Sequence, residues 1–319
     1  MNLVKRIRNL VRHLLIGHLT YEHLHLEEKL LENKLMLGAL HARISKNEHF
    51  KNIQEAEFKV FSQFGEDGII QYLVNNLPIK NRTFVEIGSG DYSESNTRFL
   101  LEHNSWKGII IDKESDVLDF VQKGKGKYLY YSYDLTALCK EITPENVNSI
   151  LSKYFSANNI GLLSLDIDGI DYWIMEKILS SFKPEIIVHE YNATFGNTTP
   201  VSVPLKNHFD RNKEHYSGLY FGASLPAFFN LITKNGYYFV GTNTAGNNAF
   251  FVKNTIKGRI PKVTLENGFT MSKYRESKDK VENLTYLTTQ KERLNQIKSM
   301  KLINVKTNNT IHCSDLITN

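Results

Sequence analysis

The sequence predicts an α/β fold built on a seven-stranded, mostly parallel sheet. Three observations support this prediction. Strand-like and helix-like patterns alternate through the middle of the chain, a glycine-spaced acidic turn follows the first strand, and two strands joined by a turn-rich loop close the series. Alternation of this kind forms βαβ units with right-handed crossovers. The closing pair makes the last strand antiparallel, because a hairpin reverses the direction of the chain.

Each element is placed by its own pattern of apolar residues. We expect the strands at 84–87, 108–111, 128–131, 161–165, 186–188, 237–240 and 249–252. We expect the helices at 96–103, 117–122, 144–154, 172–180 and 225–235. An N-terminal helical extension precedes this series.

The composition is that of an ordinary soluble globular protein. The chain has 319 residues, of which 41% are hydrophobic and 23% are charged, enough for one large α/β domain with an extension. A net charge of +5 suits acidic or phosphorylated substrates but does not indicate nucleic acid. The two cysteines, Cys139 and Cys313, lie far apart. This argues against a thiolate metal site or a disulfide framework and favours a cytoplasmic protein.

The first fifty residues form a distinct region. Apolar residues recur at helical spacing from position 3 to 15 with basic residues between them, and a second helical pattern follows at 24–40. Histidines interrupt the apolar start, so a signal peptide is not expected, and no apolar run is long enough to span a membrane. We expect residues 1–55 to mediate homo-oligomerisation. The alternative is peripheral contact with the inner face of a membrane.

The remaining chain divides at a change of composition. Residues 56–255 carry the alternating patterns and are expected to form the α/β domain. Residues 256–319 are rich in lysine and asparagine, have weak periodicity, and receive no functional assignment.

The turn after the first strand predicts a cofactor site. It reads Thr-Phe-Val-Glu-Ile-Gly-Ser-Gly-Asp over 83–91, and Gly88 and Gly90 leave room for a ligand against the main chain. A dinucleotide fingerprint requires a third glycine where this chain has Ser93. Glu86 is also better placed beside a cation than beside a pyrophosphate. These features favour S-adenosylmethionine (SAM), whose sulfonium and amino groups are positive.

Further cofactor contacts are expected at three positions. Asp112 ends the second strand, where a carboxylate can bind both hydroxyls of a ribose. Asp134, expected after the third strand, is a candidate for the adenine amino group. Gln63 belongs to the segment 61–68, whose glycines and polar side chains suit a loop that folds over the cofactor.

Acidic side chains follow two neighbouring strands. The oxygen ligands Asp166, Asp168, Glu190 and Asn192 come from these strand ends and suit Mg²⁺ or Mn²⁺. The carboxyl ends of parallel strands meet at one edge of a sheet, where ligands bind. An alternative is that Asp171 caps the following helix and that Asp166 binds the backbone or the cofactor.

Two other features bear on catalysis. His189 is a candidate general base, because its ordinary pKa lies near neutrality. The long polar stretch between the fifth strand and the next helix, which includes 208–211 and 215–216, is where a lid over an acceptor would lie.

The chain resembles a known enzyme family. It is similar to the SAM-dependent methyltransferases found among bacterial capsule and exopolysaccharide genes, which are distantly related to the FkbM-type O-methyltransferases. The matching stretches are SQFGEDG at 62–68, FVEIGSGD at 84–91, SNTR at 95–98, ITPEN at 142–146, LLSLDIDGIDYW at 162–173, EYN at 190–192, GASL at 222–225 and NAFFV at 248–252. They occur in order over residues 60–253, and both extensions lie outside them.

The resemblance implies a Rossmann-like class I methyltransferase fold that transfers a methyl group from SAM to a sugar hydroxyl. The sugar is expected to be nucleotide-activated or part of a glycan. Carried over by position, the cofactor contacts are Glu86, Gly88, Gly90 and Asp112. The resemblance also supports Asp168, Glu190 and Asn192 as ligands of a magnesium ion. The sequence Glu-Tyr-Asn replaces the adjacent acid pair of metal-dependent relatives, which leaves metal dependence open.

Two other classes of function compete with this interpretation. One is an NAD(P)-dependent sugar oxidoreductase or epimerase, disfavoured by Ser93 and by the absence of a Tyr-x-x-x-Lys pair after the fourth strand. The other is a non-catalytic scaffold in a glycan assembly complex that recruits partners through residues 1–50.

Overall fold

A computed structural model describes residues 2–46, 48–256 and 258–317, without the side chains of 2–21 and 24. Its centre is a seven-stranded sheet with the order β3-β2-β1-β4-β5-β8-β7. The strands are β1 (Thr83–Ile87), β2 (Lys107–Asp112), β3 (Leu135–Cys139), β4 (Leu162–Leu165), β5 (Ile186–Glu190), β7 (Tyr237–Thr242) and β8 (Asn248–Lys253). The first five pair in parallel, and β8 is antiparallel to both β5 and β7. The predicted fold class is therefore confirmed.

Helices cover both faces of the sheet. One face packs against α2 (Glu66–Asn76), α3 (Arg98–Asn104), α4 (Asp116–Gln122) and α5 (Lys127–Ser132). The other packs against α6 (Val147–Leu151), α7 (Asp171–Ser181) and α9 (Leu225–Lys234). Successive residues of a strand alternate between the two faces, so Phe84 and Val85 belong to different core clusters. A parallel sheet covered on both faces explains why its strands are apolar on both sides.

The third strand lies later in the chain than predicted. Residues 128–131 belong to α5, and the strand is β3 at Leu135–Cys139. Only Leu129 of that aromatic run is buried, whereas Tyr130 and Tyr131 are 57% and 72% exposed. The strand preference of aromatic residues reflects packing on a pleated, half-buried surface, and here only Leu129 reaches the core.

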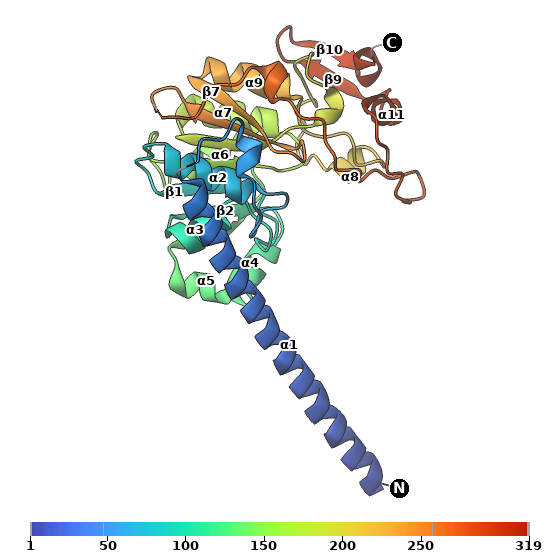
Figure 1. The fold of residues 1–319 in the computed structure, drawn as a ribbon. Coiled ribbons are helices and arrows are strands. Elements are labelled where there is room, and N and C mark those ends of the chain that lie inside the picture. Colours follow the sequence, from blue (N-terminus) through green and yellow to red (C-terminus); the bar gives the residue numbers. More distant parts are fainter. Residues whose placement is uncertain (1, 47, 257, 318–319) are drawn as a thin grey trace.

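The N-terminal extension is one long helix. Helix α1 spans Asn2–Ser45 and projects away from the body, so that the N-terminus lies far from the sheet (Figure 1). Its last turns pack on the body, where Ala42 contacts the cluster of Val60, Phe61 and Phe99. Gly38 permits this close approach, because a Cβ atom there would stand 2.5 Å from a methyl group of Val60. The two helical patterns seen in the sequence are thus parts of a single element.

The opposite face of α1 is apolar and exposed. Leu26, Leu30, Leu37, Leu40 and Ile44 are each more than half exposed. With Asn33 they follow the alternating four- and three-residue spacing of a coiled-coil seam, and we call them the apolar stripe. Homo-oligomerisation remains a prediction. The basic start of α1 has no described side chains, so membrane contact also remains a prediction. Among the described residues, no helix is long and apolar enough to cross a bilayer.

The C-terminal extension packs against the α/β body. Its elements are α10 (Leu265–Gly268), α11 (Gln290–Gln296), β9 (Lys301–Asn304), β10 (Asn309–His312) and the 3₁₀ turn η3 (Cys313–Leu316). Strand β9 pairs with β10 and with the short β6 (Val201–Ser202), which comes from the segment between β5 and α9. Leu294 and Leu302 join the core on the α7 and α9 side. The remaining short elements are α8 (Arg211–Glu214), η1 (Ile53–Ala56) and η2 (Ala193–Phe195).

Candidate functional site

The glycine turn lies at the carboxyl edge of the sheet, directly after β1. Gly88 and Gly90 have positive φ angles of 84° and 54°. The amide of Gly88 donates to the Ile111 carbonyl at 2.8 Å, which holds the turn against the end of β2. A cavity of about 350 Å³ opens here and is lined by both glycines, by Asp112 and by Asp166. We call it the glycine-turn cavity.

Asp112 lies at the position expected of a ribose ligand. It is the last residue of β2, and its carboxylate accepts hydrogen bonds from the amides of Gly90 and Glu114 at 2.8 and 2.9 Å. The side chain is only partly buried and faces the glycine-turn cavity. Each carboxylate oxygen has more than one lone pair, so both can accept further hydrogen bonds from a ligand.

Glu86 holds the segment that follows the glycine turn through hydrogen bonds. Its carboxylate accepts hydrogen bonds from the hydroxyl of Ser95 at 2.6 Å, from the amide of Asn96 at 2.9 Å and from the hydroxyl of Thr97. Burial raises the pKa of this carboxyl, while those hydrogen bonds act in the opposite direction. Glu86 borders a cavity of about 300 Å³ that also includes Gln63, and its main role in this structure is to fix the loop that leads into α3.

Asp134 does not lie near the glycine turn. Because the third strand begins at Leu135, Asp134 precedes β3 rather than following it, and it lies at the opposite edge of the sheet. Its carboxylate is 3.9 Å from the ammonium group of Lys107, at the start of β2. The prediction that Asp134 contacts adenine is therefore wrong, because it rested on the misplaced strand.

The segment 61–68 folds over the site through its buried acids. Asp67 accepts hydrogen bonds from the amides of Val60, Phe61 and Ser62 at 2.7–2.8 Å. Glu66 accepts from the side chains of Asn243 and Asn248 in the β7–β8 hairpin, at 2.6 and 2.9 Å. These bonds tie the segment to the sheet edge. Gln63 consequently lines two of the cavities at the site.

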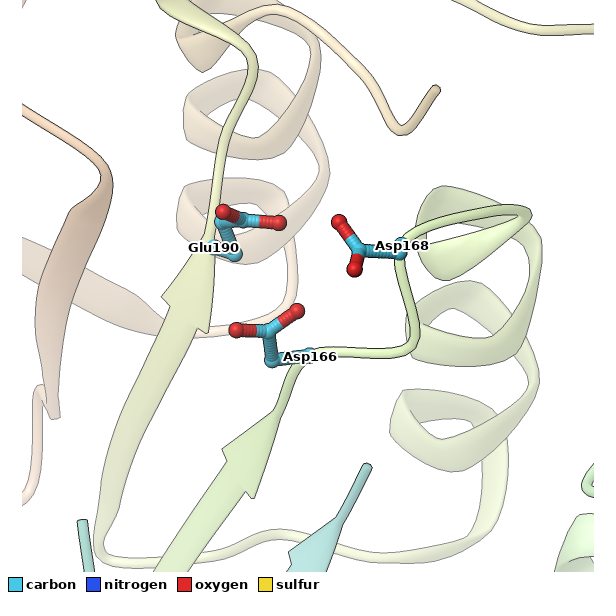
Figure 2. Close-up of side chains that lie close together, drawn as sticks. All are labelled: Asp166, Asp168 and Glu190. Atoms are coloured by element: carbon cyan, nitrogen blue, oxygen red, sulfur yellow. The ribbon is translucent and has the colours of Figure 1, made fainter. Parts of the chain in front are cut away.

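Three carboxylates converge where β4 and β5 end. Asp166 follows β4, Asp168 lies in the loop before α7, and Glu190 is the last residue of β5 (Figure 2). One oxygen of each lies within 4.8 Å of the others. We call these residues the acid cluster. They line a cavity of about 250 Å³, the acid-cluster cavity.

The loop that carries the acid cluster is shaped by Asp171. The two oxygens of this buried carboxylate accept hydrogen bonds from the amides of Ile167 and Gly169, both at 2.8 Å. The loop turns sharply as a result, and Asp168 has a positive φ of 55°. Asp171 thus acts as a local cap that orients Asp168.

Burial and neighbouring acids raise the pKa values of two carboxyls in the acid cluster. Burial raises the pKa of Asp166 well above its ordinary value, and Asp168 and Asp171 raise it further. Burial and the neighbouring Asp166 likewise raise the pKa of Glu190 well above its ordinary value. Carboxylates packed this closely require a shared proton or a cation.

Arg211 provides part of the compensating charge. Its guanidinium donates to Asp168 at 2.5 Å and to the Gly218 carbonyl at 3.0 Å, and it lies 4.2 Å from the ring centroid of Phe221. Burial lowers the pKa of Arg211, but Asp168 and Glu190 raise it more, so its net pKa lies above the ordinary value. In the sequence, Arg211 belongs to the long polar stretch that is expected to cover an acceptor, and no individual role is predicted for it. No local pattern distinguished it from its polar neighbours.

Asn192 lines the acid-cluster cavity together with the three carboxylates. Its side-chain NH₂ donates to the carbonyls of Leu219 and Phe221 at 2.9 and 3.0 Å, and its oxygen accepts from the amide of Thr194 at 3.0 Å. These hydrogen bonds cap η2 and hold a loop, and the side-chain oxygen keeps a second lone pair. Asn192 as a metal ligand therefore remains a prediction, whereas Asp166, Asp168 and Glu190 form the cluster.

His189 is a core residue. It is fully buried, its ring centroid lies 4.0 Å from that of Phe228 and 5.6 Å from that of Phe251, and its Nδ1 is 3.0 Å from the Glu190 carbonyl oxygen. Burial lowers the pKa of the imidazole to about 4. Adjacent strand residues point to opposite faces, so His189 faces the α9 layer while Glu190 reaches the site. The prediction of His189 as a catalytic base is therefore wrong.

The strand order of the sheet, with β8 antiparallel between β5 and β7, defines the class I methyltransferase fold. No protein-family model matches the chain, and no curated protein matches its sequence.

Three solved structures with partial similarity are one biosynthetic protein and two methyltransferases. The pyocyanin biosynthetic protein PhzM is 12% identical over 56% of this chain and 52% of that chain, with a TM-score of 0.34. An O-methyltransferase family protein from Burkholderia thailandensis is 8% identical over 71% and 58%, with a TM-score of 0.34. The CurJ carbon methyltransferase is 13% identical over 59% and 52%, with a TM-score of 0.36. The chain thus spans little more than half the length of each of these proteins.

Proposed function

We propose that the protein is a SAM-dependent O-methyltransferase. The observation that carries the proposal is the junction of two cavities. The glycine-turn cavity and the acid-cluster cavity share Asp166, Asp168 and Arg211 as wall residues. A donor bound over the glycine turn would therefore meet an acceptor bound at the acid cluster, as a two-substrate transfer requires.

Each part of the cofactor has a suitable surface. Asp112 matches the ribose diol, and the open backbone at Gly90 allows the adenosine to lie against the turn. The cavity lined by Gln63 and Glu86 also includes Gly88 and Gly90 of the glycine turn. It offers polar groups to the amino acid portion of SAM. Asp166, which borders both cavities, supplies a carboxyl near the expected position of the positive sulfonium group.

Positioning is expected to dominate the rate. Holding the methyl carbon in line with an acceptor oxygen contributes on the order of 7–11 kcal/mol. Proton removal contributes about 10²–10⁴-fold, which is a few kcal/mol. With His189 in the core, the groups that can accept the hydroxyl proton are the carboxylates of the acid cluster. The raised pKa values of Asp166 and Glu190 suit that role.

The acid cluster also fits a divalent cation. The donor set is all oxygen, three carboxylates converge, and their mutual repulsion is only partly offset by Arg211. Asp166, Asp168 and Glu190 would hold Mg²⁺ or Mn²⁺. A bound ion would orient an acceptor diol and lower the pKa of its hydroxyl.

A sugar is the proposed acceptor, most specifically a nucleotide-activated sugar for capsular or exopolysaccharide synthesis in the cytoplasm. The ordered motifs that resemble capsule-associated methyltransferases support this proposal, and the net charge of +5 suits a phosphorylated acceptor.

A thermal melt with four ligands tests the cofactor. SAM or S-adenosylhomocysteine at 100 times its dissociation constant should stabilise the protein by about 2.7 kcal/mol, whereas NAD and NADP should not. A shift with NAD or NADP alone would establish the oxidoreductase alternative. No shift with any of the four would favour the non-catalytic scaffold.

A further inference from the structure

Another cavity adjoins the acid-cluster cavity and is built mainly by the C-terminal extension. Its volume is about 640 Å³, and we call it the outer cavity. Lys273, Arg275, Leu284 and Tyr286 of the extension line it. Phe64, Tyr274 and Glu276 line both this cavity and the acid-cluster cavity, so the two adjoin.

The wall of the outer cavity is held in place by buried hydrogen bonds. Arg293 is 3% exposed, and its guanidinium donates to the carbonyls of Leu287, Ser272 and Tyr274 at 3.0–3.2 Å. The amide of Lys273 donates to the Ala245 carbonyl at 2.8 Å, which ties the segment to the β7–β8 hairpin. An arginine whose three guanidinium nitrogens each donate to a backbone carbonyl fixes the path of the chain, so the cavity is a built feature of the fold.

The chemistry of the wall is cationic and aromatic. Lys273 and Arg275 are both exposed, and among the described residues neither lies within 4.0 Å of a carboxylate oxygen. Tyr274 and Tyr286 are 44% and 59% exposed, and the Phe64 ring stands edge-on to Tyr274 with 6.1 Å between centroids. Unpaired cations attract phosphate, and exposed aromatic faces stack on planar bases.

We propose that the outer cavity binds the nucleoside diphosphate portion of the acceptor. The diphosphate lies against Lys273 and Arg275, the base stacks on Tyr286, and the sugar passes Tyr274 and Glu276 into the acid-cluster cavity. The choice of sugar as acceptor rests on the proposed function, but the binding of a nucleoside diphosphate to this cavity does not. The C-terminal extension, which the motifs leave outside the methyltransferase core, is thereby the acceptor-binding part of the protein.

Calorimetric titration of the full chain with UDP, GDP, dTDP and inorganic pyrophosphate tests this site. At least one nucleoside diphosphate should bind more tightly than pyrophosphate. The double substitution Lys273→Ser with Arg275→Ser should weaken both kinds of ligand by at least about tenfold, because each charged contact is lost. Tyr286→Ala should weaken the nucleotide and leave pyrophosphate unchanged.

The matched control removes the same charge elsewhere in the extension, with Lys298→Ser and Lys306→Ser, and should leave all affinities unchanged. Equal loss in the control and the test variant would overturn the site, as would failure of all four probes to bind. Binding of S-adenosylhomocysteine is measured on the same samples. If it binds and the nucleotides do not, the inference fails alone. If nucleotides bind through Lys273 and Arg275 and S-adenosylhomocysteine does not, the proposed methyltransferase function fails alone.

Discussion

The backbone of Asp166 occupies the space that a side chain at Gly88 would need. A Cβ atom on Gly88 would stand 1.4 Å from the Asp166 carbonyl oxygen, and Gly88 also has a φ of 84°. The amide of Asp166 in turn donates to the Ile87 carbonyl at 2.9 Å, so β1 and β4 stay in register up to the site. The glycine turn and the first acid of the acid cluster are therefore parts of one packed unit.

This contact predicts a large difference between two glycine substitutions. Gly88→Ala should destabilise the protein by about 3 kcal/mol or more, from the clash and the strained φ together. Gly90→Ala should cost only about 1–2 kcal/mol, because Gly90 has a positive φ but no atom within 4 Å of its Cβ position. Urea denaturation of both variants measures this difference. Equal losses would contradict the tight contact at Gly88.

The ribose assignment predicts that Asp112→Ala weakens SAM binding by about 10–100-fold, as expected for lost hydrogen bonds to a charged group. Asp134→Ala is the matched control, since it removes the same side chain at the opposite edge of the sheet. Calorimetry with SAM measures both affinities. Unchanged affinity in Asp112→Ala would remove the ribose assignment, and a loss in Asp134→Ala would contradict the placement of Asp134 away from the cofactor.

The metal proposal predicts that Mn²⁺ binds the wild-type protein and that Asp168→Asn and Glu190→Gln each weaken this binding strongly. Loss of one carboxylate ligand removes both charge and a coordination site. Glu176→Gln, an exposed acid on α7, is the control and should bind Mn²⁺ normally. Electron paramagnetic resonance measures how much Mn²⁺ is bound to each protein. Wild-type protein that binds none would leave proton transfer to the carboxylates of the acid cluster alone.

Asp67 predicts a specific pH dependence of stability. Burial raises its pKa from 3.8 to about 6, against the effect of hydrogen bonds from Ser62, Val60 and Phe61. One of its oxygens is buried without a partner, which fits a site that takes up a proton. Between these pKa values the folded state binds the proton more tightly than the unfolded chain. This contribution to the free energy of unfolding is therefore largest near pH 4 and is lost as the pH rises to about 6.

The loss amounts to at most about 3 kcal/mol, because the pKa of Asp67 rises from 3.8 to about 6 on folding. Asp67→Asn cannot titrate, so the difference in unfolding free energy between wild type and variant should fall as the pH rises from 4.5 to 7. Urea titrations at several pH values measure it. A difference that stays constant, or rises, would show that Asp67 is ionised throughout.

The apolar stripe of α1 predicts self-association of the full chain. Leu30→Glu with Leu37→Glu places charges at two seam positions and should produce a monomer, because a coiled-coil seam does not tolerate adjacent buried charges. The control, Glu28→Gln with Glu32→Gln, changes exposed positions off the stripe and should keep the oligomer. Sedimentation equilibrium distinguishes them. A monomeric wild type that binds anionic vesicles would favour the membrane-surface alternative.

Some features of the site depend on residues that are close together in the chain, and others depend on contacts between distant segments. The alternation of patterns predicted the sheet apart from the position of its third strand, and the glycine turn with Asp112 followed from local rules for strand ends. The meeting of Asp166, Asp168 and Glu190 also followed, because neighbouring parallel strands end at one edge of a sheet. These conclusions need only the periodicity of the backbone and the directions of the strands.

Only the tertiary structure decided the rest. His189 and Glu190 are adjacent in sequence, yet the pleat and the aromatic side chains of α9 and β8 bury one and leave the other at the site. Arg211 binds Asp168, which lies 43 residues away in the chain. Arg293 holds the wall of the outer cavity through the carbonyls of Ser272 and Tyr274, and that cavity also includes Phe64 and Ala245. Such contacts depend on how distant segments pack, and no local periodicity encodes them.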